Sequence, residues 1–108
     1  MQLESLADAI ERLGRRGFTH DLRVEDGRLL DLATGQVHEP ERLEIADLVR
    51  FEGESDPDEQ AVLFALRSPG GRPLGLLASV FGAALPPEEG DVIRRLGGKA
   101  PRGERSAP

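Results

Sequence analysis

The segment at residues 61–67, with the sequence AVLFALR, constrains the fold more than any other. Its positions are apolar one after another up to Arg67, so both faces of an extended chain would be apolar. Turn-forming residues bound it on each side, in Asp56-Pro57-Asp58 and in Ser68-Pro69-Gly70-Gly71. A short apolar run between turn signals predicts a central β-strand that is covered on both faces.

The N-terminal segment predicts a helix. Ser5 and Asp8 have the spacing of a capping box, in which each side chain can satisfy a free backbone N–H group. Gly17 is well placed as the left-handed residue that ends the helix. Apolar residues follow the cap at helical spacing and predict one apolar face: Leu6, Ala9, Ile10 and Leu13.

Alternating apolar residues and turn signals predict the remaining elements. Asp26-Gly27 is typical of a type I′ turn, which makes a tight β-hairpin. Pro40 indicates one helical turn in the connector that follows the hairpin. The expected elements are strands at 22–25, 28–32, 43–52 and 73–83 and a short helix at 86–96. Within strand 43–52 we expect one apolar face, interrupted by Asp47 and made of Leu43, Ile45, Val49 and Phe51.

These elements predict a single α+β domain over residues 1–96. Short loops between consecutive strands favour an antiparallel sheet of four to five strands, with the N-terminal helix and the short C-terminal helix on one face. Residues 97–108 hold three basic residues and one acid, a net charge of +2, and no apolar side chain larger than Ala. Because such a segment cannot offset its ordering entropy by burial, we expect a disordered basic tail.

Composition excludes several classes of function. The chain has 108 residues, which is enough for one domain. The absence of cysteine excludes disulfides, thiol nucleophiles and zinc–thiolate sites. A net charge of −6 and the lack of Trp and Tyr argue against nucleic-acid binding. No apolar run is long enough to span a membrane, and the N-terminus does not resemble a signal peptide, so we expect a cytoplasmic protein.

The densest polar cluster follows the strand at 43–52. Arg50 and Glu52 are two residues apart and share a strand face, where the guanidinium could hold a carboxylate or phosphate. Alternatively, they form a surface ion pair of little energetic consequence. Oxygen ligands for Ca²⁺ or Mg²⁺ would be available in this cluster, but an ordinary solvated hairpin loop fits the same residues and we assign no metal. The candidate binding residues are Arg50, Glu52, Glu54, Ser55, Asp56 and Asp58.

No catalytic constellation is recognisable in the sequence. His20-Asp21 and His38-Glu39 are adjacent pairs, and neighbouring strand residues point to opposite faces, so neither pair forms a base with its orienting carboxylate. We expect both histidines at the surface. The glycines at 70–71 lack the order of a phosphate-binding loop, and no serine lies in a nucleophile elbow. We therefore expect no cofactor and assign no catalytic residue.

The stretch at residues 48–59, LVRFEGESDPDE, resembles a family of small uncharacterised bacterial proteins that often carry the name phosphoribosylpyrophosphate synthetase. The shared pattern is a hydrophobic residue followed by R-F-E-G-x-S-[DN]-P-[DE]-[DE], and the resemblance extends over roughly residues 5–85. It departs from the family at Val80-Phe81-Gly82, where members often have Ala-Tyr-Gly. The resemblance implies a compact α+β domain centred on Arg50, Glu52, Gly53, Ser55, Asp56 and Pro57.

Two hypotheses for the function follow. The first is a small binding or regulatory module without catalytic activity, whose partner is a protein or a small anionic ligand. The second is an enzyme or sensor that acts on a phosphorylated sugar or nucleotide, which rests on the family name, Arg50 and the nearby carboxylates. Neither the partner nor the oligomeric state follows from the sequence.

Overall fold

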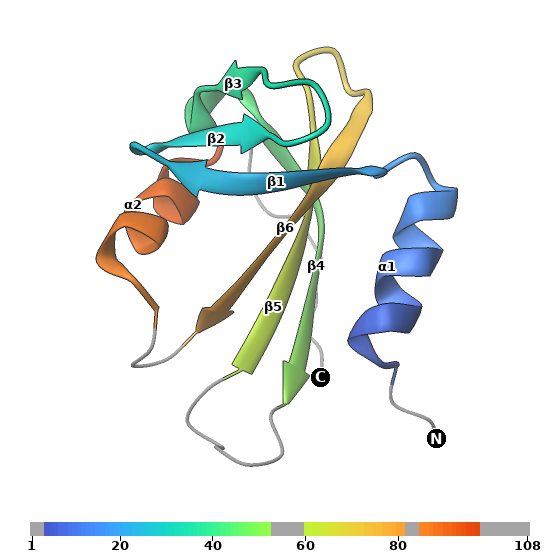
Figure 1. The fold of residues 1–108 in the computed structure, drawn as a ribbon. Helices are drawn as coiled ribbons and strands as arrows, with labels where there is room; N and C mark the ends of the chain where they lie inside the picture. The colour runs from blue at the N-terminus through green and yellow to red at the C-terminus, as the bar shows by residue number, and fades with distance from the viewer. Residues whose placement is uncertain (1–3, 53–59, 82–84, 98–108) are drawn as a thin grey trace.

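The described part of the chain forms one curved six-stranded sheet with two α-helices (Figure 1). The computed structural model describes residues 4–52, 60–81 and 85–97. The predicted tail, apart from Gly97, lies outside the described residues. In chain order the elements are α1 (Leu6–Arg15), β1 (His20–Glu25), β2 (Arg28–Asp31), β3 (Val37–His38), the 3₁₀ turn η1 (Pro40–Arg42), β4 (Glu44–Glu52), β5 (Gln60–Arg67), β6 (Pro73–Phe81) and α2 (Pro87–Arg95).

The strand order is β3-β2-β1-β6-β5-β4, and the sheet is mixed. Strands β1, β2 and β3 are antiparallel to one another, as are β4, β5 and β6, but β1 and β6 are parallel. The prediction of an antiparallel sheet with four to five strands is therefore wrong in strand number and in this one pairing. After β3 the chain passes through η1 to the far edge of the sheet, so the returning β6 lies beside β1 and runs in the same direction.

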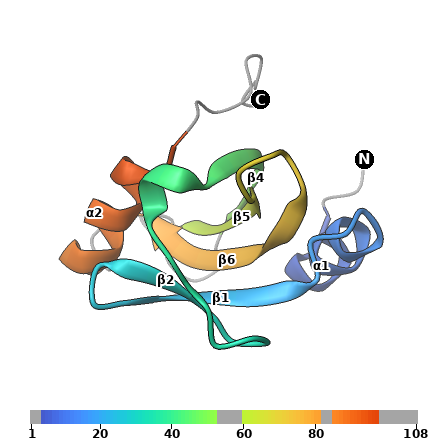
Figure 2. The same ribbon diagram turned by 90° about the horizontal axis from the view of Figure 1, so that it is seen from above.

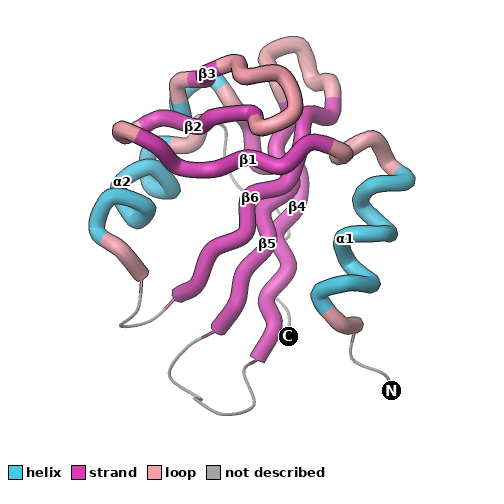
Figure 3. The backbone as a smooth tube through the Cα atoms, in the orientation of Figure 1, coloured by secondary structure: helices cyan, strands magenta, loops and turns pink. Residues whose placement is uncertain are grey.

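A glycine permits the contact between β1 and β6. A Cβ atom at Gly75 would collide with the backbone carbonyl of His20, its register partner on β1. The two strands pair over three residues only, from His20 to Leu22 on β1. Beyond this contact they diverge, as the tube drawing in Figure 3 shows. The backbones of β1 and β6 are therefore in close contact near Gly75, and the two strands separate beyond the Leu22–Leu77 pair.

Local signals in the sequence produce the expected local structures. The Ser5 hydroxyl accepts a hydrogen bond from the Asp8 backbone N–H at 3.0 Å, which caps α1. Gly17 has a φ of +105°, in the left-handed region. Asp26 and Gly27 both have positive φ, 53° and 73°, and join β1 to β2 as a tight hairpin. The strand predicted at 61–67 is β5, and its buried residues face both sides of the sheet.

The two helices pack on opposite faces of the sheet, not on one face as predicted (Figure 2). We name these the α1 face and the α2 face. The buried cluster on the α1 face is Ala9, Leu13, Phe18, Leu63, Ala65 and Leu76. The larger cluster on the α2 face is Leu22, Leu29, Leu43, Val62, Phe64, Leu66, Leu77, Val92 and Leu96. Because β5 is apolar on both faces, each helix finds an apolar surface to cover.

A β-bulge in β4 changes the face that its residues present. Ala46 and Asp47 together oppose Ala65, since the register shifts between Ile45 and Asp47. Ile45 therefore packs on the α2 face, whereas Ala46, Val49 and Phe51 pack on the α1 face. The predicted grouping of Ile45 with Val49 and Phe51 is wrong for this reason. The bulge also explains Asp47, which lies on the α1 face and pairs with Arg16 at 3.4 Å.

Polar contacts hold α2 against η1 and the β1–β2 hairpin. The Arg95 guanidinium donates to the Glu41 carboxylate at 2.8 Å and to the Gly27 carbonyl at 3.0 Å. The Glu88 carboxylate accepts from the Gly27 backbone N–H at 2.8 Å. The hydrogen bond with Arg95 holds the pKa of Glu41 below its ordinary value. These bonds fix the hairpin from the α2 face and leave its other face uncovered.

Candidate functional site

The α1 face of β1, β2 and β3 has no helix over it. We name this surface the open half. The strand register orders it into two cross-strand rows. One row is Leu76, Asp21 and Leu32, and the other is Arg23, Leu30 and Val37. On the α2 face of the same three strands, Leu22, Leu29 and Asp31 are buried.

Large apolar side chains are exposed on and beside the open half. Within the described residues, four large hydrophobic side chains are exposed: Leu6 (39%), Ile10 (44%), Leu32 (48%) and Val37 (54%). Leu6 and Ile10 are one turn apart on α1, so they lie on the same side of that helix. Ile10 and Leu32 line the same groove. Single exposed apolar residues are ordinary, but a set gathered on one surface of a small domain indicates an interaction site.

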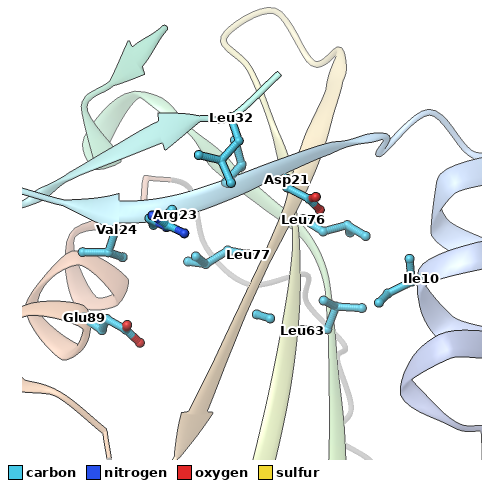
Figure 4. A pocket seen from close by; sticks show the side chains of 11 residues that line it. Ile10, Asp21, Arg23, Val24, Leu32, Leu63, Leu76, Leu77 and Glu89 are labelled. Atoms are coloured by element: carbon cyan, nitrogen blue, oxygen red, sulfur yellow. The ribbon is translucent and has the colours of Figure 1, made fainter. Parts of the chain in front are cut away.

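The groove lies where β1 and β6 diverge, between α1 and α2 (Figure 4). Its volume is about 390 Å³. Leu63, Leu76 and Ala78 contribute apolar surface from the sheet, and Ile10 projects toward them from α1. This opening follows from the sheet geometry, because β1 pairs with β6 only as far as Leu22 and leaves the lower part of β6 without a neighbour on that side.

Three charged residues line the groove: Asp21, Arg23 and Glu89. The Glu89 carboxylate accepts a hydrogen bond from the Ser79 hydroxyl at 2.8 Å. Asp21 and Arg23 lie two residues apart on the same face of β1, and neither side chain makes a hydrogen bond or ion pair within the described part of the chain. Asp21 and Arg23 therefore place opposite charges side by side on an apolar surface, and neither charge stabilises the described part of the protomer through an ion pair.

The structure places the sequence-predicted site elsewhere. Arg50 is exposed on the edge strand β4, opposite Val62, and Glu52 ends the same strand opposite Gln60. The register puts both positions on the same face, as expected, and this is the α2 face. Glu54, Ser55, Asp56 and Asp58 lie outside the described residues. Of the sequence-predicted site, the structure therefore places only the positions of Arg50 and Glu52, and neither lines the groove.

Two titratable groups that the sequence patterns did not bring together are in contact in the structure. His20 Nδ1 lies 2.7 Å from Asp31 Oδ2, so the pair is formed between strands β1 and β2. Asp31 is only 1% exposed, and its other oxygen accepts from the backbone N–H groups of Ala33 and Thr34. An ionised carboxylate only accepts hydrogen bonds, so Nδ1 of His20 carries the proton.

The hairpin register contains the signal for this pair. A two-residue turn at Asp26-Gly27 places Leu22 opposite Asp31, so His20 is the diagonal neighbour of Asp31 on the same face. The acid that follows each histidine in the sequence is not its partner here, because neighbouring strand residues point to opposite faces. The expectation that His20 is a surface residue is therefore wrong in part, because its ring is half-buried against a carboxylate.

The environment of Asp31 favours its ionised form. Burial raises the pKa of this carboxyl group, but the hydrogen bonds from His20, Ala33 and Thr34 lower it by more. The net pKa is below the ordinary value of 3.8. The pair links β1 to β2, and among the described residues no hydroxyl group bonds to His20.

The described residues contain no group of three His, Asp or Glu side chains that could hold a metal ion. No helix in the described ranges is long and apolar enough to cross a membrane. In comparisons with known proteins, no protein-family model, curated protein or solved structure matches this chain.

Proposed function

We propose that this protein is a binding module without catalytic activity, and that it binds another polypeptide through the open half. The observation that carries the proposal is the gathering of exposed apolar side chains beside the groove, with Ile10 and Leu32 both lining it. A polypeptide suits this surface, because its apolar side chains can cover the rows while its polar groups meet Asp21 and Arg23.

Recognition of a phosphorylated sugar or nucleotide is the alternative. It is supported by the guanidinium of Arg23, which lines the groove and has no partner in the described chain. However, the carboxylates of Asp21 and Glu89 line the same groove and repel a phosphate group. Two carboxylates against one guanidinium favour the polypeptide.

Selection from a displayed peptide library tests the proposal. Peptides enriched on the parent protein should bind a Leu32→Ser variant about tenfold more weakly or worse, since truncation of an apolar anchor removes buried area. Arg42→Ser is the matched control, because Arg42 is also exposed but lies in η1, away from the open half. Peptides that bind the parent and Leu32→Ser equally would contradict the proposal.

Isothermal titration with ATP, ribose 5-phosphate and Mg²⁺ separates the two functions. The polypeptide-binding proposal predicts no heat of binding for any of the three. Saturable heat that disappears in an Arg23→Ala variant would favour the phosphate-binding alternative. The Arg50 segment is tested in the same titration with Arg50→Ala, which keeps the groove unchanged.

A further inference from the structure

We infer that the polypeptide bound by the open half is a second copy of this chain, held by reciprocal ion pairs between Asp21 and Arg23. This inference rests on the proposed function, because it requires the open half to be a binding surface. It adds the identity of the partner and the register in which the two copies meet.

The charge pattern of β1 is self-complementary. In a two-fold symmetric pair, if residue i of one copy contacts residue j of the other, then j also contacts i. Asp21 and Arg23 have opposite charges, lie on one face two residues apart, and are without partners in the described protomer. A two-fold axis that passes between their rows sets Asp21 of each copy against Arg23 of the other. The dimer then contains two ion pairs, and each of the four charges is paired once.

The apolar residues of the two rows follow the same symmetry. Leu32 lies in the row of Asp21, and Leu30 lies in the row of Arg23. The register that pairs the charges therefore sets Leu32 of one copy against Leu30 of the other. Burial of these side chains supplies the attraction, and the ion pairs fix the register, since like charges face one another in any register shifted by one row.

Charge reversal tests the register directly. In an Arg23→Asp chain, two acids on each copy face two acids on the other, so this variant should be monomeric. In an Asp21→Arg chain, basic residues face basic residues, and this variant should be monomeric as well. An equimolar mixture of the two variants restores every opposite-charge contact, and it should form a heterodimer. Arg42→Asp is the matched control, an exposed charge reversal outside the open half.

Sedimentation velocity of the full chain across a wide range of concentration is the measurement. We expect the parent and Arg42→Asp to sediment as dimers at high concentration. The dissociation constant of each single variant should rise about tenfold or more, and the mixture should recover dimer. At a concentration where the parent is monomeric, circular dichroism should give similar melting curves for all variants, because Asp21 and Arg23 are exposed and their side chains make no hydrogen bond or ion pair within the described residues.

Three results would overturn the inference: a parent that is monomeric at every concentration, a dimer unaffected by either reversal, or a mixture that stays monomeric when the parent dimerises. The proposed function fails separately. A monomeric parent whose selected peptides still depend on Leu32 retains the open half as a binding surface and loses only the second copy as its partner. A parent that neither dimerises nor selects Leu32-dependent peptides loses both.

Discussion

The two halves of the sheet differ in how many of their faces are covered. In the half made of β4, β5 and β6, residues of β5 are buried on both faces, with Phe64 on the α2 face and Leu63 on the α1 face. In the half made of β1, β2 and β3, burial is confined to the α2 face, whereas Leu32 and Val37 are exposed on the other. The described residues form two α-helices, and α1 covers only one half of the face on which it packs. The comparison indicates that the doubly covered half supplies stability and that the open half is available for binding.

Phe64→Ala should have the largest effect. Phe64 is 1% exposed at the centre of β5, and its truncation leaves a cavity that the surrounding strands cannot fill. We expect the free energy of unfolding to fall by about 3–5 kcal/mol, measured by urea denaturation. A loss below about 1 kcal/mol would show that the doubly covered half is not the main source of stability.

Gly75→Ala tests the β1–β6 pairing, which connects the two halves of the sheet. The added methyl group would collide with the His20 carbonyl, and either β1 or β6 must move. We expect a loss of about 3 kcal/mol in the free energy of unfolding. Gly14→Ala is the control, since a Cβ at Gly14 meets no atom within 4 Å and a helical alanine is favourable. A neutral Gly75→Ala would mean that the parallel pairing of β1 with β6 contributes little.

Asp31→Asn tests the polar link between β1 and β2, which lies on the face opposite the open half. The pKa of Asp31 is lowered in the folded protein, so its stabilising contribution is present above its ordinary pKa of 3.8 and is lost as the pH falls through the lowered value. We expect the variant to be about 2 kcal/mol less stable than the parent at neutral pH, with the difference shrinking in acid. Urea denaturation at several pH values measures this, and a difference that does not vary with pH would exclude the ionised pair.

Leu32→Ser should have the smallest effect on folding. Leu32 is 48% exposed, and surface substitutions of this kind change stability within about 0.5 kcal/mol. A thermal melt of the parent and the variant checks this. The loss of unfolding free energy should therefore be much smaller for Leu32→Ser than for Phe64→Ala. A large loss at Leu32 would mean that the open half is part of the core, and its role as a binding surface would have to be abandoned.

Several elements were predictable because neighbours along the chain decide them. Ser5 caps α1 through an atom three residues away, and Asp26-Gly27 closes the hairpin through its own backbone angles. The buried strand β5 was predicted from its apolar run alone. The hairpin register even contained the His20–Asp31 pair, which a diagonal comparison across the turn would have found.

The open half could not be predicted in the same way. Whether Leu32 is buried or exposed depends on which part of the sheet α1 covers, and the pattern of Leu32 itself is the same in both cases. The predicted site at Arg50 came from a dense run of charges. The structure describes only Arg50 and Glu52 of that site, so its role stays a prediction. The groove residues come from α1, β1, β5, β6, α2 and the residue that follows β2, and no single segment carries their pattern.

The sequence by itself determined the local elements: the capped helix, the hairpin turn, the η1 turn and the buried strand. Each depends on contacts within a few residues, where backbone preference and apolar spacing act directly. Only the tertiary structure decided the parallel pairing of β1 with β6, the placement of the helices on opposite faces and the bulge at Ala46. These features depend on pairings between distant segments, and the alternatives have the same local patterns. Gly75 illustrates the difference, because it appears in the sequence as one small residue in a strand, and only the approach of the His20 backbone shows why no larger residue fits there.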